Sequence, residues 1–341
     1  MNCFLSRNYK GLNNAGNKAK TDIENTMEKM GFKNIGLKRT YSEHSITHFF
    51  LNLIGVLKAI FSIQKGDILI LQYPLKKYFS FVCRMAHLRG AKVIVLIHDL
   101  GSFRRKKLTI EQEMKRLGFS DHIITHNNRM KEWLEQNGCK PQLSTLEIFD
   151  YLSTTKAKST SNLQKPFSVL YAGGLAKRKN TFLYEIGEHM SSYTLNLYGK
   201  GFEMEEAKGA ERIQYKGFVQ SDTLIATAEG DFGLVWDGFT LEGCTGDFGE
   251  YLQYNNPHKT SLYIRCELPI IIWNKAALAS FIKQNNIGIC VDSLTELNEI
   301  LAKLSMEEYQ QMKANVKKIS AQLADGHYAR TAILRAIQQL S

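Results

Sequence analysis

Short apolar runs alternate with helix-length amphipathic segments along the whole chain. Two of these runs, residues 67–72 and 92–98, are apolar almost throughout, as expected for strands buried on both faces of a parallel sheet. The predicted strands are 1–6, 67–72, 92–98, 122–126, 167–172, 194–198, 213–217, 232–236, 270–273 and 289–291. The predicted helices include 21–31, 109–118, 221–229, 259–266, 276–285 and 295–304, with one or two more in 306–340. This alternation predicts an α/β fold.

A polar stretch of small residues from Asp150 to Pro166 interrupts the alternation. Structureless loops beyond about 12–15 residues are uncommon inside compact domains, so we interpret the stretch as a linker rather than a surface loop. A chain of 341 residues is long enough for about two domains. We therefore predict Rossmann-like, doubly wound domains over 1–152 and 167–341, joined by a linker over 153–166 and facing each other across a cleft. Packing of the last helix back on the first domain is left open.

The longest apolar stretch, 49–63, is shorter than the ~20 residues of a membrane-spanning helix. We interpret it as a buried helix. The alternative is a membrane-leaning helix beside Lys76, Lys77 and Arg84. The first ten residues lack the apolar core of a secretory signal, so we expect a cytoplasmic protein, with peripheral contact to the inner membrane left open.

Charge is distributed unevenly along the chain. The formal net charge is +11, and residues 1–170 hold 27 Lys and Arg against 13 Asp and Glu, whereas residues 171–341 hold 17 against 20. A basic first half favours an anionic partner, for which nucleic acid, lipid head groups and a phosphate-bearing substrate are all candidates. The six cysteines form no Cys-x-x-Cys pair, which argues against a zinc ribbon or a disulfide framework and favours free thiols in a reducing compartment.

Two segments have the composition of a phosphate-binding site. Gly173 and Gly174 follow a predicted strand and precede three cations, Lys177, Arg178 and Lys179, a pattern in which backbone approaches an anion closely. Further along, Pro257 is expected in the first turn of a helix capped by Asn256. The opening turns of that helix carry His258, Lys259, Thr260 and Ser261. Free N–H groups, the helix dipole and a lysine suit a diphosphate, although a solvated basic turn and a well-capped surface helix explain the same residues.

Other predicted strand ends carry side chains suited to chemistry. Trp236 and Asp237 end one strand, with a buried Trp and a turn-opening Asp as the alternative. His98 and Asp99 end another, where either group could take a proton from a hydroxyl. A second histidine, His126, ends the next strand, and a lone histidine is more often structural. No Asp-x-Asp occurs, so a diphosphate would be held by cations and a helix N-terminus rather than through a metal.

Three blocks, 232–237, 244–263 and 267–279, resemble bacterial galactofuranosyltransferases that build O-antigen, lipopolysaccharide and capsule repeats. The segments 96–99, 126–127, 148–152 and 171–173 agree more loosely. Glucosyltransferases that extend glycans on streptococcal adhesins are wider relatives. The resemblance implies a GT-B fold with the acceptor domain first, a UDP-sugar donor and no metal.

The resemblance also implies roles for individual residues. Lys259 matches the diphosphate-binding lysine, with His258, Thr260 and Ser261 around it, and Gly173 matches the glycine that approaches the phosphate. The uracil pocket falls at Gly217, Phe218 and Val219. A loop that reaches the donor falls at 11–17, including Ala15 and Gly16.

Two departures from the family pattern leave roles open. Gly174 stands where related chains often have Asn, and the family's arginine aligns with Lys177 or Arg178. The basic run Arg104, Arg105, Lys106 and Lys107 is interpreted as a contact for lipid pyrophosphate or anionic membrane, with a solvated loop as the alternative.

These residues and the resemblance together predict a metal-independent hexosyltransferase, and the resemblance implies that it inverts. It would move galactofuranose from UDP-galactofuranose to a hydroxyl of a lipid-linked oligosaccharide, with Asp99 as general base and His98 orienting or replacing it. The alternatives are transfer of glucose or another hexose from its UDP donor, a UDP-sugar epimerase, an inactive donor-binding scaffold and a nucleic-acid-binding protein. No nucleic-acid motif supports the last. A homo-oligomer is left open.

Overall fold

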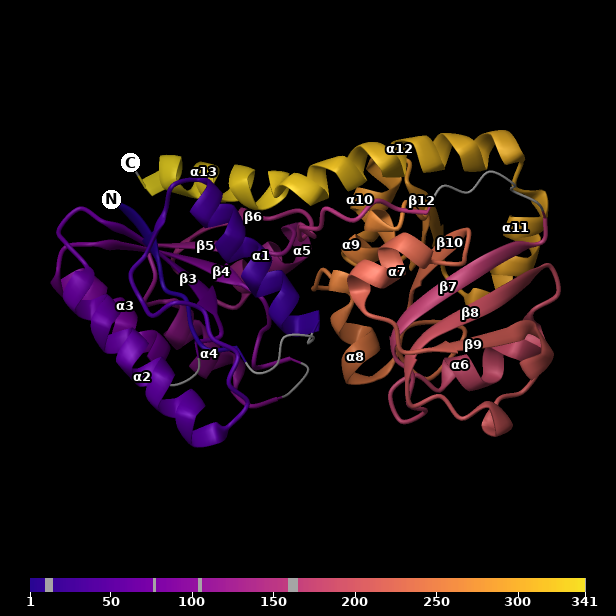
Figure 1. Ribbon diagram of the computed structural model, residues 1–341, viewed down its shortest axis with the longest axis horizontal. Helices are drawn as coiled ribbons and strands as arrows, with labels where there is room; N and C mark the ends of the chain where they lie inside the picture. Colours follow the sequence, from indigo (N-terminus) through magenta and orange to yellow (C-terminus); the bar gives the residue numbers. More distant parts are fainter. Residues whose placement is uncertain (10–14, 76–77, 104–105, 159–164, 341) are drawn as a thin grey trace. The chain divides into compact units, whose positions relative to one another are not determined.

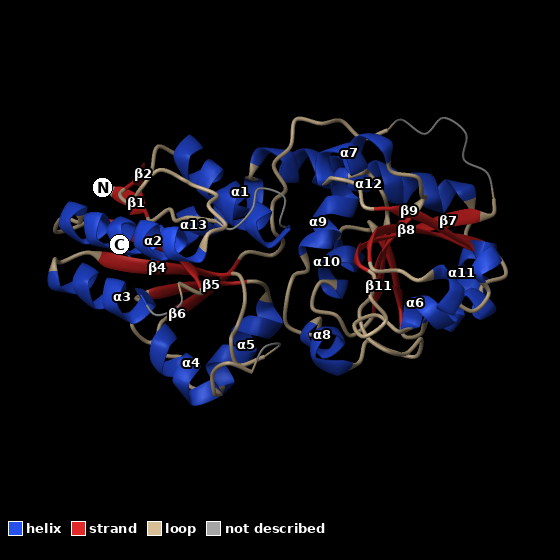
Figure 2. Cartoon of the chain, turned by 60° about the horizontal axis from the view of Figure 1, so that its bottom comes forward, coloured by secondary structure: helices blue, strands red, loops and turns tan. Residues whose placement is uncertain are grey.

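The computed structural model describes residues 1–9, 15–75, 78–103, 106–158 and 165–340. The chain divides into two compact units, which we call unit 1 (Met1–Asp150 and Asp325–Ser341) and unit 2 (Tyr151–Ala324). Each unit holds one six-stranded sheet in which every strand pair is parallel, with helices packed against its faces (Figures 1 and 2). This is the α/β architecture that the apolar runs predict.

Unit 1 has the strand order β2-β1-β3-β4-β5-β6. Its strands are β1 (Asn2–Phe4), β2 (Lys33–Asn34), β3 (Ile68–Tyr73), β4 (Lys92–Ile97), β5 (His122–Thr125) and β6 (Gln142–Thr145). Its helices are α1 (Ala15–Lys29), α2 (Ser45–Ser62), α3 (Phe79–Leu88), α4 (Ile110–Leu117), α5 (Asn128–Gln136) and α13 (His327–Leu340). The strands β3 and β4 are buried along nearly their whole length, because helices cover the sheet.

Unit 2 has the strand order β12-β11-β10-β7-β8-β9. Its strands are β7 (Phe167–Gly174), β8 (Tyr193–Lys200), β9 (Ile213–Gly217), β10 (Phe232–Val235), β11 (Ile270–Trp273) and β12 (Gly288–Val291). Its α-helices are α6 (Phe182–Glu185), α7 (Ser221–Thr227), α8 (Gly246–Tyr251), α9 (His258–Arg265), α10 (Ala279–Gln284), α11 (Leu297–Lys303) and α12 (Met306–Asp325). Short 3-10 helices are η2 (Ile186–His189), η3 (Met204–Glu206), η4 (Ala210–Arg212) and η5 (Leu294–Glu296).

The strand order places one topological switch point in each unit. In unit 2 the chain runs outward from β7 through β8 to β9 and then returns to β10 on the other side of β7. In unit 1 it runs from β1 to β2 and returns to β3 beside β1. The loops at such a point diverge, so the carboxyl ends of β7 and β10, and of β1 and β3, are where ligands of doubly wound sheets bind.

The boundaries between segments differ in part from the expectation. The described part of 153–166 packs on unit 2, because the guanidinium of Arg265 donates to the carbonyls of Ser153 (2.8 Å) and Thr155 (3.0 Å). The predicted elements of unit 1 do not include the strands β2 and β6 or the helices α3 and α5. The two strands are short, two and four residues, so their hydrophobic pattern is weak.

The interpretation of 49–63 as a buried helix is wrong. Helix α2 spans this stretch, but only Gly55, Val56, Ala59 and Ile60 are buried. The apolar side chains of Ile46, Phe50, Ile54, Leu57 and Phe61 are exposed. The 18-residue helix is long and apolar enough to cross a membrane by length and composition. Apolar length alone does not distinguish a helix covered on all sides from one covered on a single face.

The chain returns to unit 1 at its C-terminus. Helix α13 packs against α1 and against the strands β4, β5 and β6. The carboxylate of Asp150 caps this helix, because it accepts from the backbone N–H of Tyr328 (3.2 Å) and of Ala329 (2.6 Å). Burial of Asp150 raises its pKa to about 7, with the N–H bonds opposing the rise and Asp22 adding to it.

Replacing Asp150 by Asn should change how stability depends on pH. An unfolded Asp titrates near pH ~3.9, so between about pH 4 and 7 the folded chain holds a proton at Asp150 that the unfolded chain has lost. The free energy of unfolding should therefore fall as pH rises through this window, by up to about 4 kcal/mol. Urea denaturation across the window should show a shallower decline for Asp150→Asn. The exposed Asp325→Asn serves as the control, and equal slopes for both variants would contradict the role of Asp150.

Candidate active site

The candidate active site lies at the switch point of unit 2. Strand β7 ends in Gly173 and Gly174. Its neighbour in the sheet, β10, is followed directly by Trp236 and Asp237. Helix α9 begins at His258 and presents Lys259 to the same place. Three segments separated by up to about ninety residues are thus brought together by the sheet order.

A buried carboxylate forms the centre of this site. Asp237 Oδ1 lies 3.0 Å from Lys259 Nζ, accepts from the Tyr171 hydroxyl at 3.0 Å and lies 3.4 Å from Lys179 Nζ. Lys259 Nζ also donates to the Tyr171 hydroxyl (3.0 Å) and to the carbonyl of Trp236 (3.3 Å), and lies 4.3 Å from the centre of the Tyr171 ring. We call Asp237, Lys259, Lys179 and Tyr171 the acid–lysine cluster.

The charges of the acid–lysine cluster depend on one another. Burial by itself would raise the pKa of Asp237, but Lys259 and Lys179 hold it below its usual value, so the carboxylate is ionised. Burial lowers the pKa of Lys259, while Asp237 opposes that shift. Burial also raises the pKa of Tyr171, whose hydroxyl stays protonated and donates. Two ammonium groups around one carboxylate leave a local charge of +1, which suits an incoming phosphate.

The cation that reaches this site from the loop after β7 is Lys179. The resemblance left open whether Lys177 or Arg178 contacts the diphosphate. The ammonium of Lys177 instead lies 2.6 Å from the exposed Glu206 and over the ring of Tyr184, and no contact between Arg178 and the cluster is observed. Lys179 is the last of the three cations in the motif, and the resemblance assigns the family's arginine to one of the two before it.

The glycines at the end of β7 shape the approach to the cluster. Gly173 has φ +154°, a conformation that side-chain-bearing residues rarely adopt. A Cβ at Gly174 would meet no atom within 4 Å, so packing does not require glycine there and the absent side chain leaves space. The amide of Asn180 fixes the turn by donating to the Gly174 carbonyl (2.7 Å).

The opening turn of α9 carries the other predicted residues. Pro257, rather than Asn256, is the N-cap of α9. The ring of His258 stacks on Tyr151 with centroids 4.7 Å apart. Thr260 and Ser261 are buried, and the Thr260 hydroxyl has no hydrogen-bond partner among the described residues.

Two buried contacts hold α9 in place. The Tyr263 hydroxyl accepts from the backbone N–H of Ala172 (2.7 Å) and donates to its carbonyl (3.2 Å), which ties the helix to β7. Arg265, in the last turn, donates to the hydroxyl of Ser320 on α12 (2.8 Å). Lys259 therefore projects from a helix that is fixed at two points along its length.

The remaining predicted donor residues lie further from the cluster or point away from it. The Trp236 ring is fully buried and its N–H donates to the Thr240 carbonyl (3.1 Å), so only its backbone carbonyl meets Lys259. Gly217 ends β9, two strands away from β7. Phe218 is exposed and Val219 half-buried, with Lys200 Nζ 4.9 Å from the Phe218 ring centre. Their assignment to a uracil pocket stays a prediction.

In unit 1, His98 and Asp99 follow β4 as predicted. His98 Nε2 lies 2.6 Å from the side-chain oxygen of Gln72, and the Gln72 amide nitrogen donates to the Lys20 carbonyl (3.2 Å). Because that amide oxygen can only accept, Nε2 of His98 carries the proton. The His98 ring also stacks on Phe149, with centroids 5.3 Å apart. Asp99 is half-buried in the loop beside it.

The second histidine of unit 1 has a structural position. His126 is fully buried, its Nε2 donates to the Ile97 carbonyl (3.1 Å), and burial lowers its pKa to about 3. It is therefore neutral at ordinary pH. Its ring meets Phe149 edge-on, 4.9 Å between centroids, so it supports the aromatic ring on which His98 stacks.

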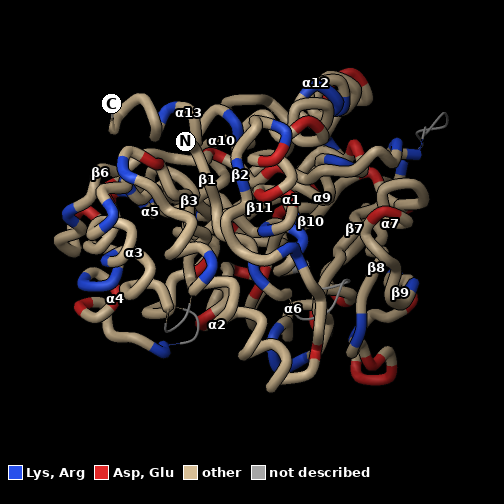
Figure 3. The backbone as a smooth tube through the Cα atoms, turned by 60° about the vertical axis from the view of Figure 1, so that its left-hand side comes forward, with Lys and Arg blue, Asp and Glu red and all other residues tan. Residues whose placement is uncertain are grey.

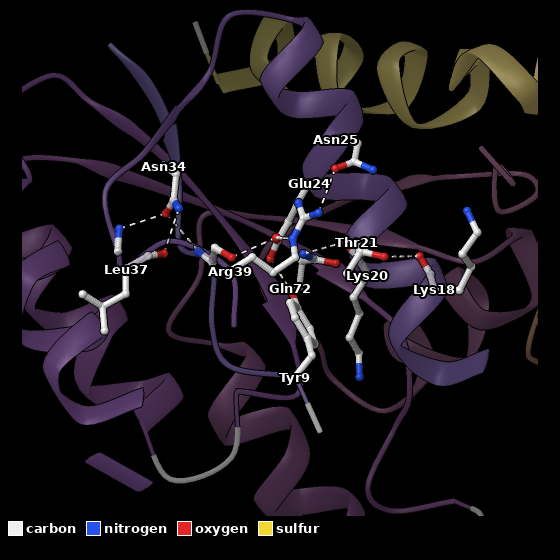
Figure 4. Close-up of polar contacts among 12 residues, drawn as sticks. Tyr9, Lys18, Lys20, Thr21, Glu24, Asn25, Asn34, Leu37, Arg39 and Gln72 are labelled. Atoms are coloured by element: carbon white, nitrogen blue, oxygen red, sulfur yellow. Dashed lines mark hydrogen bonds and ion pairs between the residues drawn. The ribbon is translucent and has the colours of Figure 1, made fainter. Parts of the chain in front are cut away.

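Another buried carboxylate lies near the switch point of unit 1 (Figure 4). Glu24 on α1 accepts from Tyr9 Oη, from Arg39 Nε (2.8 Å) and from the Ser6 hydroxyl (2.8 Å). Burial raises the pKa of Glu24, and its partners oppose the shift. Sequence reasoning missed this group, because its members are separate polar residues without a motif.

Several predicted contacts fall at or beyond the edges of the described segments. Residues 11–14 of the predicted donor loop, Arg104 and Arg105 lie outside the described residues. Ala15 and Gly16 open helix α1. Lys106 and Lys107 are described and Lys107 is exposed. In the part of the chain that the structure describes, no group of three or more His, Cys, Asp or Glu side chains is arranged to hold a metal ion.

Comparison with known proteins identifies a matching family over nearly the whole chain. The profile described as "Glucosyltransferase 3-like, N-terminal domain" matches residues 2–148, and "Glucosyltransferase 3-like, C-terminal domain" matches residues 169–336. Two curated relatives are similar. The β-1,6-galactofuranosyltransferase WbbI of Escherichia coli (strain K12) is 34% identical over 82% of this chain and 81% of its own. Glucosyltransferase 3 of Streptococcus gordonii is 25% identical over 94% of both chains.

Solved structures share the fold at low sequence identity. The lipopolysaccharide outer core galactosyltransferase WaaB aligns over 100% of both chains with a TM-score of 0.62 and 11% identity. A glycosyltransferase of Rickettsia africae aligns over 100% of this chain and 99% of its own with a TM-score of 0.59 and 11% identity. Identities this low establish the fold alone, which is the GT-B arrangement of two parallel α/β domains that the sequence predicts.

Removing Lys259 should destabilise unit 2, because Asp237 would stay buried with Lys179 as its remaining ion-pair partner. We expect Lys259→Met to lower the free energy of unfolding by about 3 kcal/mol. The double variant Lys259→Met with Asp237→Asn should recover most of that loss, because the uncompensated charge is removed. Urea denaturation measures both, with the exposed Lys177→Met as a control expected to change stability by less than about 1 kcal/mol. A double variant no more stable than the single one would show that the carboxylate is not the cause.

Proposed function

The chain belongs to the glucosyltransferase 3-like family of GT-B glycosyltransferases, and from that premise we propose which sugar it moves and with which residues. As a member of this family it is a glycosyltransferase that uses a nucleotide-sugar donor and a glycan acceptor. The proposed reaction transfers galactofuranose from UDP-galactofuranose to a hydroxyl of a lipid-linked oligosaccharide in O-antigen, lipopolysaccharide or capsule synthesis. Inversion at the anomeric carbon would give a β-furanoside.

The observation that carries this proposal is the acid–lysine cluster at the switch point of unit 2. As the glycosidic bond to the diphosphate breaks, the leaving UDP gains negative charge. Lys259 and Lys179 present two ammonium groups, and the N-terminus of α9 adds N–H donors and its dipole. These groups would stabilise the leaving diphosphate without a metal, and metal independence is part of the proposal.

On the acceptor side we assign Asp99 as the general base. An inverting displacement needs a group that takes the proton of the attacking hydroxyl. His98 is held by Gln72 and by the stack on Phe149, with its Nε2 already protonated, so it is placed to orient rather than to accept at that nitrogen. Asp99 is the neighbouring carboxylate at the end of the same strand.

The choice of galactofuranose rests on the relatives. The relative at 34% identity is named a galactofuranosyltransferase, whereas the one named a glucosyltransferase is 25% identical. UDP-glucose is therefore the alternative donor. The lipid-linked acceptor is the setting in which the net positive charge of the first half is useful, because such acceptors lie at an anionic membrane.

A donor panel tests the sugar directly. Purified protein with EDTA, a lipid-tailed glycoside acceptor and one of UDP-galactofuranose, UDP-galactose, UDP-glucose or UDP-N-acetylglucosamine is analysed by mass spectrometry. A hexose added only from UDP-galactofuranose is the expected result, and EDTA should not reduce it. Transfer from UDP-glucose alone would move the protein to the glucosyltransferase alternative. Donor conversion without acceptor would indicate an epimerase, and donor binding without turnover would indicate a scaffold.

The two lysines of the loop after β7 should behave differently. Lys179→Met should weaken UDP binding about tenfold, because it removes a cation that lies 3.4 Å from Asp237. Lys177→Met should change binding less than twofold, because that ammonium pairs with Glu206. Isothermal titration with UDP measures both, and the reverse order of effects would assign the site to Lys177.

Asp99→Asn should lower the transfer rate about 10²–10⁴-fold and leave UDP affinity unchanged, because a base acts on the acceptor and not on the donor. The exposed carboxylate Glu111 on α4 provides the matched control as Glu111→Gln. Single-turnover kinetics give the rate and titration with UDP gives the affinity. A full rate in Asp99→Asn would exclude this carboxylate as the base.

A further inference from the structure

Helix α2 carries an apolar stripe on its outer side. The stripe consists of side chains that are between 42% and 76% exposed: Ile46, Phe50, Ile54, Leu57 and Phe61. Their spacing of four, four, three and four residues places them on one face of an α-helix. On the neighbouring helix α3, Phe81 and Leu88 are also exposed. A row of exposed apolar side chains on one helix face is the kind of surface that marks an interaction site.

The opposite face of α2 belongs to the core of unit 1. Val56, Ala59 and Ile60 pack in the same cluster as Leu69 and Leu71 of β3. A membrane-spanning helix would have to leave these contacts, because its whole circumference would face lipid or other spanning segments. Helix α2 is therefore long and apolar enough to enter a bilayer, yet held by the sheet in a position from which only its outer face can reach one.

The charges around the stripe are predominantly positive, with the exposed Glu43 before α2 as an acidic exception. Residues 44–90 hold six Lys and Arg residues and a single acidic residue, Asp67. The Asp67 carboxylate is buried and lies 3.0 Å from the terminal amine of Met1, so it does not contribute an exposed negative charge. Figure 3 colours the Lys and Arg residues of the described chain blue and its Asp and Glu residues red along the backbone tube.

Four of the cations lie on or directly after the two helices. Lys58 is exposed on α2 and Lys65 follows that helix. Arg84 is exposed on α3, and Arg89, after α3, donates to the carbonyls of Phe61 (3.2 Å) and Ile63 (2.9 Å). The chain segments that carry Lys65 and Arg89 meet, because the N–H of Gly66 donates to the Gly90 carbonyl (2.9 Å). A basic corner thus borders the C-terminal end of the apolar stripe.

We propose that this face of α2, with its basic corner, docks unit 1 on the surface of an anionic lipid bilayer, with the helix lying in the plane of the interface. Apolar side chains entering the acyl boundary and cations meeting anionic head groups are the two contributions that hold such helices. A second copy of the chain is a poorer occupant, because the cations near the stripe outnumber the acidic residues, so two such faces would repel each other. The inference deepens the proposed function by naming the surface that brings the enzyme to a lipid-linked acceptor.

Vesicle co-sedimentation tests the docking face without any sugar. The intact protein is centrifuged with vesicles of phosphatidylglycerol and phosphatidylcholine in equal parts, and with vesicles of phosphatidylcholine alone. The triple variant Ile54→Gln, Leu57→Gln, Phe61→Gln should bind the anionic vesicles at least about tenfold more weakly than the wild type. The double variant Ile110→Gln, Leu334→Gln changes exposed apolar residues elsewhere in unit 1 and is the matched control, expected to bind as the wild type does. Circular dichroism and thermal unfolding check that both variants fold.

A charge variant tests the basic corner separately, in case the triple variant does not fold. Lys58→Glu with Lys65→Glu should weaken binding to anionic vesicles at least about tenfold and flatten its dependence on salt. Equal binding of the wild type to both vesicle types, or binding to neither, would overturn the proposal. So would a dimer in sedimentation velocity that the triple variant abolishes, because a second copy would then cover the face.

Transfer to a water-soluble acceptor separates this inference from the proposed function. The triple variant should transfer sugar to a soluble glycoside at the wild-type rate, because none of its substitutions lies in the proposed site. Its binding to anionic vesicles should be lost. Vesicle binding without transfer from any donor would contradict the proposed function and leave the docking face intact. Transfer by a wild type that does not bind vesicles would contradict only the docking face.

Discussion

The buried carboxylate of Asp237 is the constraint on which the candidate site depends. An ionised carboxylate that is largely buried is tolerated only with cations and hydrogen-bond donors around it, and Lys259, Lys179 and Tyr171 fulfil that requirement. The same requirement holds α9 and the loop after β7 against the end of β10. A phosphate that enters between the two lysines would take over part of the role of the carboxylate. The site is therefore arranged before a ligand arrives, at the cost of two charges removed from water.

The surrounding packing transmits this arrangement to the backbone. Tyr263 bonds both polar groups of Ala172 on β7, and its ring lies where a Cβ at Gly233 would come within 2.4 Å, so α9 approaches β10 closely. Arg265 then fixes the far end of the helix to α12 and to the segment 153–155. In unit 1, Gln72 plays a comparable part for His98, since it joins the end of β3 to α1 and to the end of β4. In both units the polar groups beyond the strands are held by side chains of neighbouring elements rather than by their own loops.

Prediction from the sequence succeeded where the physical signal is local and strong. Apolar runs such as 92–98 mark β4 and its neighbours, because strands buried on both faces need apolar residues at every position. It failed where one pattern fits two environments. The stretch 49–63 has the composition of a buried helix, yet α2 exposes one face, and which face is covered depends on elements far away in the chain. In the loop after β7, three adjacent cations differ only in direction, and the turn fixed by Asn180 decides that Lys179 meets the carboxylate.

The sequence by itself determined the α/β class, the positions of the main strands along the chain, the place of the phosphate-binding candidates after strands, and the resemblance to a glycosyltransferase family. The first three properties follow from local composition and spacing, and the resemblance rests on the residues of the matching blocks. Only the tertiary structure decided that Asp237 pairs with Lys259 and Lys179, that Glu24 gathers Tyr9 and Arg39, and that α2 keeps an apolar face outside. Burial, ion pairing and exposure are relations between segments distant in sequence, and the strand order of each sheet sets them.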